Sequence, residues 1–140
     1  MIDADLVDKK LAVIETTVLE LRTMGRPMDV RTDLREFRFE VYTLQISIQA
    51  ALDVAAHIVA GERLGEPRTN RQLFELLVRN HWLPEELAVP LHQMVGFRNI
   101  VVHGYEIVDP AIVQDITSHH LDELVSFVEA IRARLPTDPS

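Results

Sequence analysis

The strongest periodic pattern in the chain covers residues 37–59, which read FRFEVYTLQISIQAALDVAAHIV. Apolar residues recur there three or four positions apart: Phe37, Val41, Leu44, Ile48, Leu52, Ala55 and Val59. This spacing is typical of an amphipathic α-helix with a wide apolar face. It predicts a long helix that begins near Asp29 or Thr32 and ends near Ala60, before a loop rich in glycine.

A polar row follows the same predicted helix. Its members lie three or four positions apart: Tyr42, Gln45, Gln49, Asp53 and His57. Two interpretations are open at this point. The row is either a solvated helix face, or it lines a groove and supports a functional site.

Working outward, the flanking segments also carry helical spacing. Residues 2–24 have an apolar seam that stops at Gly25-Arg26-Pro27, because glycine and proline oppose continuation. A short helix is predicted over residues 70–79, with Asn70 as its N-cap. A further helix is predicted to start at Pro84 and to run toward Phe97, since proline is favoured in a first helical turn.

The last predicted helix begins with Asp109 as N-cap and Pro110 in its first turn, and it carries apolar residues as far as Ile131. No stretch shows the sustained alternation of a strand. We therefore predict an all-α, up-and-down bundle of four long helices and one short helix, forming a single domain over residues 1–140.

Composition narrows the class of protein. The absence of cysteine excludes disulfides and thiolate metal sites. The start shows no basic region followed by an apolar run, and the longest uncharged run, from Val41 to Leu52, is too short to span a bilayer, so we expect a cytoplasmic protein without a membrane partner. The net charge of −8 argues against nucleic-acid binding by bulk electrostatics. All but two of the 14 basic residues are arginines, which suit bidentate phosphate or carboxylate binding.

The candidate functional stretch is Phe97–Tyr105, which reads FRNIVVHGY. Arg98 and His103 lie five positions apart, or about 140° around a regular helix, so they do not share a face. They can act together only at a helix end, for which Gly104 is a plausible terminator, or across a two-fold axis.

The residue types suit metal-free cleavage of RNA. An imidazole takes and gives protons near neutral pH, so His103 could deprotonate the 2′-hydroxyl or protonate the leaving 5′-oxygen. The guanidinium of Arg98 could stabilise charge that grows on the phosphate, and Asn99 adds a neutral donor and acceptor. The competing interpretation is structural, with His103 as a helix cap and Arg98 covering a carboxylate such as Glu106 or Asp53. We find no metal-binding pattern and expect no cofactor.

The stretch from Arg98 to Tyr105 resembles the signature of the HEPN superfamily, in particular the HepT-like toxins of MntA/HepT-type toxin–antitoxin systems. Their motif is an arginine, four residues, a histidine, any residue and a tyrosine. The resemblance covers nearly the whole chain, which has a long second helix with Gln49, Asp53 and His57, a short helix, the motif and a final long helix.

The resemblance implies a homodimer in which two motifs meet at a composite cleft. It implies a metal-independent endoribonuclease with Arg98 and His103 as catalytic residues and with Asn99, Gln49 and Asp53 in support. The implied partner is a minimal nucleotidyltransferase antitoxin that transfers AMP from ATP to Tyr105. The alternative is a non-catalytic HEPN module that binds nucleotide, or holds the nucleotidyltransferase, through the same motif.

Overall fold

The computed structural model describes residues 1–136, and every regular element in that range is helical, which confirms the all-α prediction. The α-helices, in order, are α1 (Ala4–Met24), α2 (Leu34–Gly61), α3 (Asn70–Arg79), α4 (Ala88–Val101), α5 (Pro110–His119) and α6 (Leu121–Arg134). Short 3₁₀ helices in the connections are η1 (Pro27–Asp29), η2 (Glu85–Leu87) and η3 (Tyr105–Ile107). The last four residues of the predicted domain, 137–140, lie outside the described residues.

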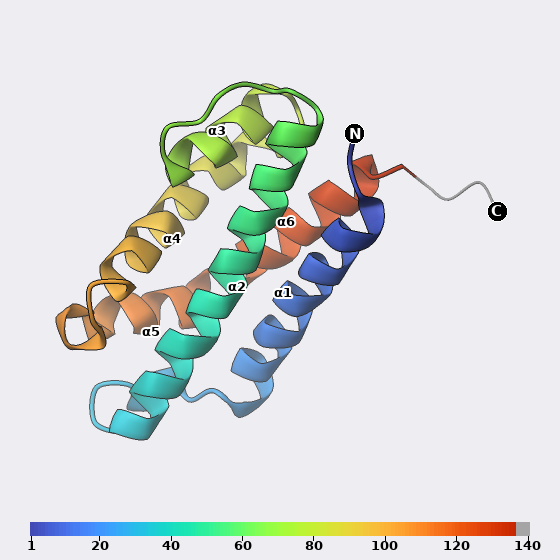
Figure 1. Ribbon diagram of the computed structural model, residues 1–140. Coiled ribbons are helices and arrows are strands. Elements are labelled where there is room, and N and C mark those ends of the chain that lie inside the picture. The colour runs from blue at the N-terminus through green and yellow to red at the C-terminus, as the bar shows by residue number, and fades with distance from the viewer. Residues whose placement is uncertain (137–140) are drawn as a thin grey trace.

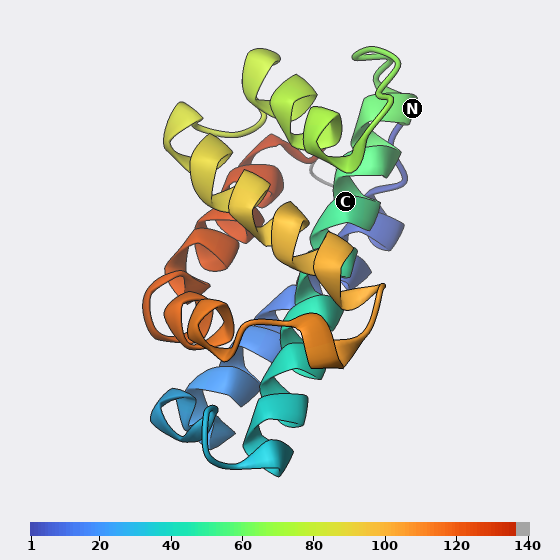
Figure 2. The same ribbon diagram turned by 90° about the vertical axis from the view of Figure 1, so that its left-hand side faces the viewer.

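Helices α1 and α2 run side by side in opposite directions, and α6 packs against α1 (Figure 1). Helix α3 lies across the end of the bundle where α2 finishes, and α4 returns from it along α2 (Figure 2). Buried apolar side chains from all these helices form one core. The predicted stripe of α2 lies in it, with Val41, Leu44 and Ala55 fully buried and Phe37 partly buried.

The start of α4 corrects one prediction. The α-helix begins at Ala88 and not at Pro84, because the intervening residues form η2. The cause is Pro90, which has no N–H to donate and whose ring clashes with the carbonyl four residues earlier. A regular helix through Glu86 is therefore blocked, and Pro90 sits instead within the first turn of α4.

The predicted last helix is in fact two, so the structure has a sixth helix where we predicted five. The chain breaks at His120, whose φ of −124° is not helical. The imidazole of His120 lies 3.2 Å from Asp115 on α5 and 3.1 Å from Glu123 on α6. A signal was present in the sequence, because Ile116 and Leu121 are five positions apart and interrupt the apolar seam.

The caps at the starts of α2 and α3 can be compared with the predictions. Helix α2, which was predicted to begin near Asp29 or Thr32, is capped by Asp33, whose side chain accepts from the N–H groups of Arg35 and Glu36. Helix α3 is capped by Thr69 and not by Asn70. In both cases the capping residue has the extended backbone that lets its side-chain oxygen reach the free N–H groups of the first turn.

By length and composition, α2 is the one helix among residues 1–136 that could cross a membrane, although 56% of its most apolar window is buried inside the protein. That burial is the behaviour of a core helix.

The same helix also buries two carboxyl groups. Glu40 is fully buried, with neither oxygen hydrogen-bonded within the described residues, and Glu36 is 6% exposed. Burial first, and then the neighbouring Glu36, raise the pKa of Glu40 to about 8.

Candidate functional site

The motif lies where α4 ends. Arg98 and Asn99 belong to its last turns, the helix stops at Val101, and His103 follows in a turn. Gly104 has a φ of +136°, a conformation that residues with a side chain rarely adopt. A Cβ at this position would also lie 2.6 Å from a carboxylate oxygen of Glu106. The glycine therefore permits the change of direction that leads into Tyr105 and η3.

The guanidinium of Arg98 is held by a chain of polar contacts that joins three helices. Its Nε donates to Oε1 of Gln49 at 3.2 Å, and Nε2 of Gln49 donates to Oδ1 of Asp53 at 2.9 Å. The other oxygen of Asp53 accepts from Nζ of Lys10 at 3.1 Å. We call this set, Lys10, Asp53, Gln49 and Arg98, the arginine relay. It fixes the plane of the guanidinium and leaves Nη atoms available for an anion.

The structure thus brings four predicted site residues together. Arg98, Gln49 and Asp53 lie in the relay, and Oδ1 of Asn99 is 3.4 Å from Nη1 of Arg98. Arg98 does not cover the carboxylate of Asp53 directly, because Gln49 lies between them. What these residues do in a reaction stays a prediction.

His103 and Tyr105 are placed differently. The side chain of His103 is exposed, and the hydrogen bonds that hold Arg98 do not include it. Within one chain, therefore, these hydrogen bonds do not link Arg98 to His103, the two predicted catalytic residues. Tyr105 is partly buried, packs against the core, and forms one wall of a groove.

This groove lies between α1 and α2 beside the motif and has a volume of about 500 Å³. We call it the α1–α2 groove, and its lining is Lys10, Val13, Tyr42, Gln45, Ile46, Gln49, Ala50, Asp53 and Tyr105. Four of the five members of the polar row line this groove, and their support of a functional site stays a prediction. The fifth, His57, instead accepts a hydrogen bond from the backbone N–H of Asp3 at 2.9 Å.

The sequence interpretation missed Lys10. Its ion pair with Asp53 joins residues 43 positions apart, so no local pattern could reveal it. The only signal was rarity, because Lys10 is one of two lysines in the chain. Arg26, in the connection after α1, pairs with Asp29 at 3.0 Å and with Asp33 at 3.5 Å.

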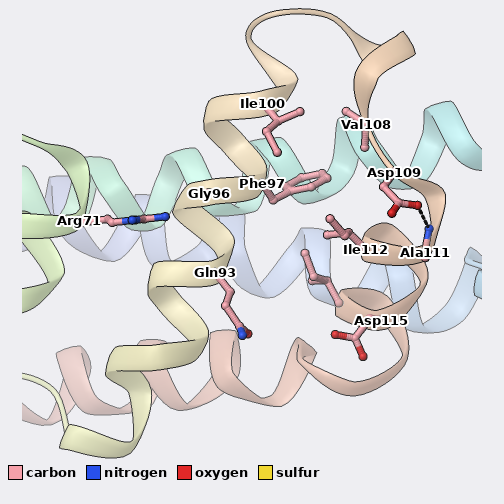
Figure 3. Close-up of a pocket in the computed structure, with 11 residues that line it drawn as sticks. Arg71, Gln93, Gly96, Phe97, Ile100, Val108, Asp109, Ala111, Ile112 and Asp115 are labelled. Atoms are coloured by element: carbon pink, nitrogen blue, oxygen red, sulfur yellow. Dashed lines mark hydrogen bonds between the residues drawn. The ribbon is translucent and has the colours of Figure 1, made fainter.

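A second pocket, of about 460 Å³, opens on the other side of α4. Figure 3 shows Phe97 and Ile100 from α4 pointing toward Val108 and Ile112 across a gap between the segments. Two charged residues lie at opposite sides of this pocket: Arg71 comes from α3 and Asp115 from α5. Ile100 and Ile112 are 38% and 40% exposed, which leaves apolar surface open beside the motif.

Metal coordination has no evident centre in residues 1–136, where no three histidine, aspartate or glutamate side chains gather in a suitable arrangement. The chemical resources of the site are an oriented guanidinium, an exposed imidazole, amides and a tyrosine hydroxyl.

Known proteins share both the sequence and this arrangement of helices. A sequence model described as "Ribonuclease HepT-like" matches residues 14–131. The mRNA nuclease HepT of Shewanella oneidensis is 31% identical over 130 residues, covering 92% of this chain and 98% of that protein. The tRNA nuclease HepT of Aphanizomenon flos-aquae is 34% identical over 138 residues, covering 89% and 94%. The solved structure of the tri-AMPylated Shewanella oneidensis HEPN toxin in complex with MNT antitoxin matches with a TM-score of 0.84 and 30% identity, covering 96% of this chain and 100% of that one.

Proposed function

Because the chain belongs to the HepT-like ribonuclease family, we propose that it is a metal-independent endoribonuclease and the toxin of a type II toxin–antitoxin pair. The observation that carries the proposal is the arginine relay, which orients Arg98 at the helix end five positions before His103. The proposed substrate is RNA, and the proposed place of action is the cytoplasm.

In the proposed reaction the 2′-hydroxyl of the substrate attacks the adjacent phosphorus. A bond forms between O2′ and phosphorus, the bond from phosphorus to O5′ breaks, and the products carry a 2′,3′-cyclic phosphate and a 5′-hydroxyl. One proton leaves O2′ and one is added to O5′, and the imidazole of His103 suits either transfer. Arg98 stabilises the negative charge that grows on the phosphate oxygens. The need for a 2′-hydroxyl restricts the reaction to RNA.

A homodimer would supply the second proton-transfer group. One imidazole cannot act as base and acid in a single concerted step. His103 is exposed in the single chain, so it is free to face a second copy of the motif. We propose that two copies meet through the apolar pocket of Figure 3. In a two-fold dimer every contact between the copies occurs twice. If Arg71 of one copy faces Asp115 of the other, the reverse pair therefore forms as well. Ile100 belongs both to this face and to the motif stretch, so the contact would bring the two motifs close together.

Ile112→Glu should therefore yield a monomer in sedimentation experiments and lose RNA cleavage, because it places a charge in the proposed interface. The control is Leu19→Glu, on α1, which alters an exposed apolar residue of another face and should leave both properties unchanged. A dimer that survives Ile112→Glu would exclude this face, and a monomer that cleaves RNA at the wild-type rate would exclude a composite site.

The proposed partner is a minimal nucleotidyltransferase antitoxin that adenylylates Tyr105. Support comes from the position of Tyr105, two residues beyond His103 and in the wall of the α1–α2 groove beside the relay. An AMP group there would place a phosphate next to Arg98 and would fill space that RNA needs.

One assay tests these proposals together. Purified wild type is incubated in EDTA with a transcribed mRNA and with bulk tRNA, next to His103→Ala and the control His119→Ala, which alters another exposed imidazole. We expect wild type and the control to cleave and His103→Ala to be inactive. Prior incubation with the antitoxin and ATP should add AMP to wild type and stop cleavage, whereas Tyr105→Phe should remain unmodified and active. A wild-type chain that is inactive and carries no AMP by intact-mass analysis would refute the nuclease proposal and leave a nucleotide- or partner-binding module.

A further inference from the structure

An aromatic side chain in the α1–α2 groove has no part in the cleavage chemistry described above. Tyr42 lies on α2 and is 59% exposed, so core packing does not account for it. It lines the groove together with Gln45 and Gln49, and Tyr105 forms part of the same lining. The groove therefore continues from the arginine relay along α2 to an open aromatic ring.

We propose that Tyr42 and Gln45 form a nucleobase subsite that holds single-stranded RNA beside the phosphate bound at Arg98. The inference rests on the proposed ribonuclease function and assigns to this surface a role in binding the substrate.

The spacing along α2 supports this assignment. Tyr42 precedes Gln49, the partner of Arg98, by seven residues, which corresponds to about 10 Å along a helix axis. Gln45 lies between them, one turn from each, and on the same side of the helix. A nucleotide next to the one whose phosphate contacts Arg98 can therefore reach the ring without leaving the groove.

The residue types suit a base more than a purely apolar ligand. Exposed aromatic rings are the usual platforms on which single-stranded bases stack. The amide of Gln45 offers both a donor and an acceptor, which is what the edge of a base requires. Val13, Ile46 and Ala50 supply apolar surface between these groups.

The charge of the groove removes an obstacle to RNA. The chain as a whole has a net charge of −8, which repels a polyanion. The only charged residues in the groove lining are Lys10 and Asp53, and they pair with one another at 3.1 Å. Arg38 lies one turn before Tyr42 on α2 and is exposed, so a basic side chain flanks each end of this path.

Binding can be measured apart from cleavage. The dissociation constant of a fluorescent single-stranded RNA is determined by anisotropy in a His103→Ala background, so that the probe stays intact. Adding Tyr42→Ala should raise the constant about tenfold, whereas Tyr42→Phe keeps the ring and should change it less than about twofold. Leu19→Ala is the matched control, because Leu19 is 60% exposed, against 59% for Tyr42, and should have no effect.

The role of Gln45 is tested with four homopolymeric RNAs, among which Gln45→Ala should reduce the differences in affinity. Unchanged binding by Tyr42→Ala, or equal losses from the alanine and phenylalanine variants, would overturn the subsite. Cleavage by wild type together with unchanged binding by Tyr42→Ala would refute the subsite alone. Tyr42-dependent binding by a chain that does not cleave RNA would refute the nuclease proposal and retain the subsite.

Discussion

Arg98→Lys should slow RNA cleavage about 100-fold, while the dissociation constant for RNA changes much less. Lysine keeps the positive charge, but it cannot donate to Gln49 and at the same time present a planar fork to a phosphate. The loss should therefore fall on the chemical step. Single-turnover cleavage of a transcribed RNA, with protein in excess, measures that step directly.

Gln49→Ala separates the orientation of the guanidinium from its presence. This variant keeps Arg98 but removes the acceptor at 3.2 Å, so we expect an intermediate loss of about tenfold. Arg35→Lys, at an exposed position in the first turn of α2, is the control and should cleave normally. If Arg98→Lys cleaved at the wild-type rate, charge alone would suffice and the relay would have no part in the reaction.

Glu40→Gln should stabilise the protein by a few kcal/mol at pH 8 and much less at pH 5, at about 1.4 kcal/mol for each unit of pKa difference. The pKa of Glu40 rises from an ordinary 4.5 to about 8 in the folded chain. Between these values the folded state keeps a proton that the unfolded state releases, so the free energy of unfolding falls as pH rises toward 8. Glutamine keeps the shape of the protonated acid and cannot ionise, which removes this slope.

Urea denaturation of both proteins at several pH values between 5 and 8 measures the difference. Glu36 does not titrate in this pH window. The protonated Glu40 beside it lowers the pKa of Glu36; burial acts in the opposite direction, and Arg26 lowers the pKa further. Glu62→Gln, at an exposed position just after α2, is the control and should keep the wild-type slope. Parallel stability curves for wild type and Glu40→Gln would show that Glu40 is ionised throughout.

Local patterns predicted most of the fold because each helix carries its own apolar period. The prediction for residues 70–79 matches α3 residue for residue, and the prediction for residues 2–24 differs from α1 only at its start. The errors occur where a single residue outweighs the period. Pro90 prevents α4 from beginning before Ala88. The last predicted helix divides into α5 and α6, where the apolar residues Ile116 and Leu121 are five positions apart. Both signals are present in the sequence, but the apolar seams on either side of them are regular enough to predict continuous helices.

For the site, the sequence predicted the residue types but not how they connect. Gln49 and Asp53 were singled out as supports of Arg98, and the structure joins all three in one relay. Lys10 completes it from a helix distant in the sequence, which no spacing rule could anticipate. The buried position of Glu40 was equally hidden, because the local sequence does not distinguish a buried glutamate from a solvated one.

The residues of the arginine relay are synthesised in a fixed order, and Arg98 comes last. A ribosome releases α1 and α2 first, so Lys10, Asp53 and Gln49 can pair before Arg98 has been synthesised. The arginine then meets an acceptor that is already in place, across 49 residues of chain. A nascent chain that ends before α4 would therefore lack the oriented guanidinium of Arg98. The proposed ribonuclease site would thus stay incomplete until most of the chain has been synthesised.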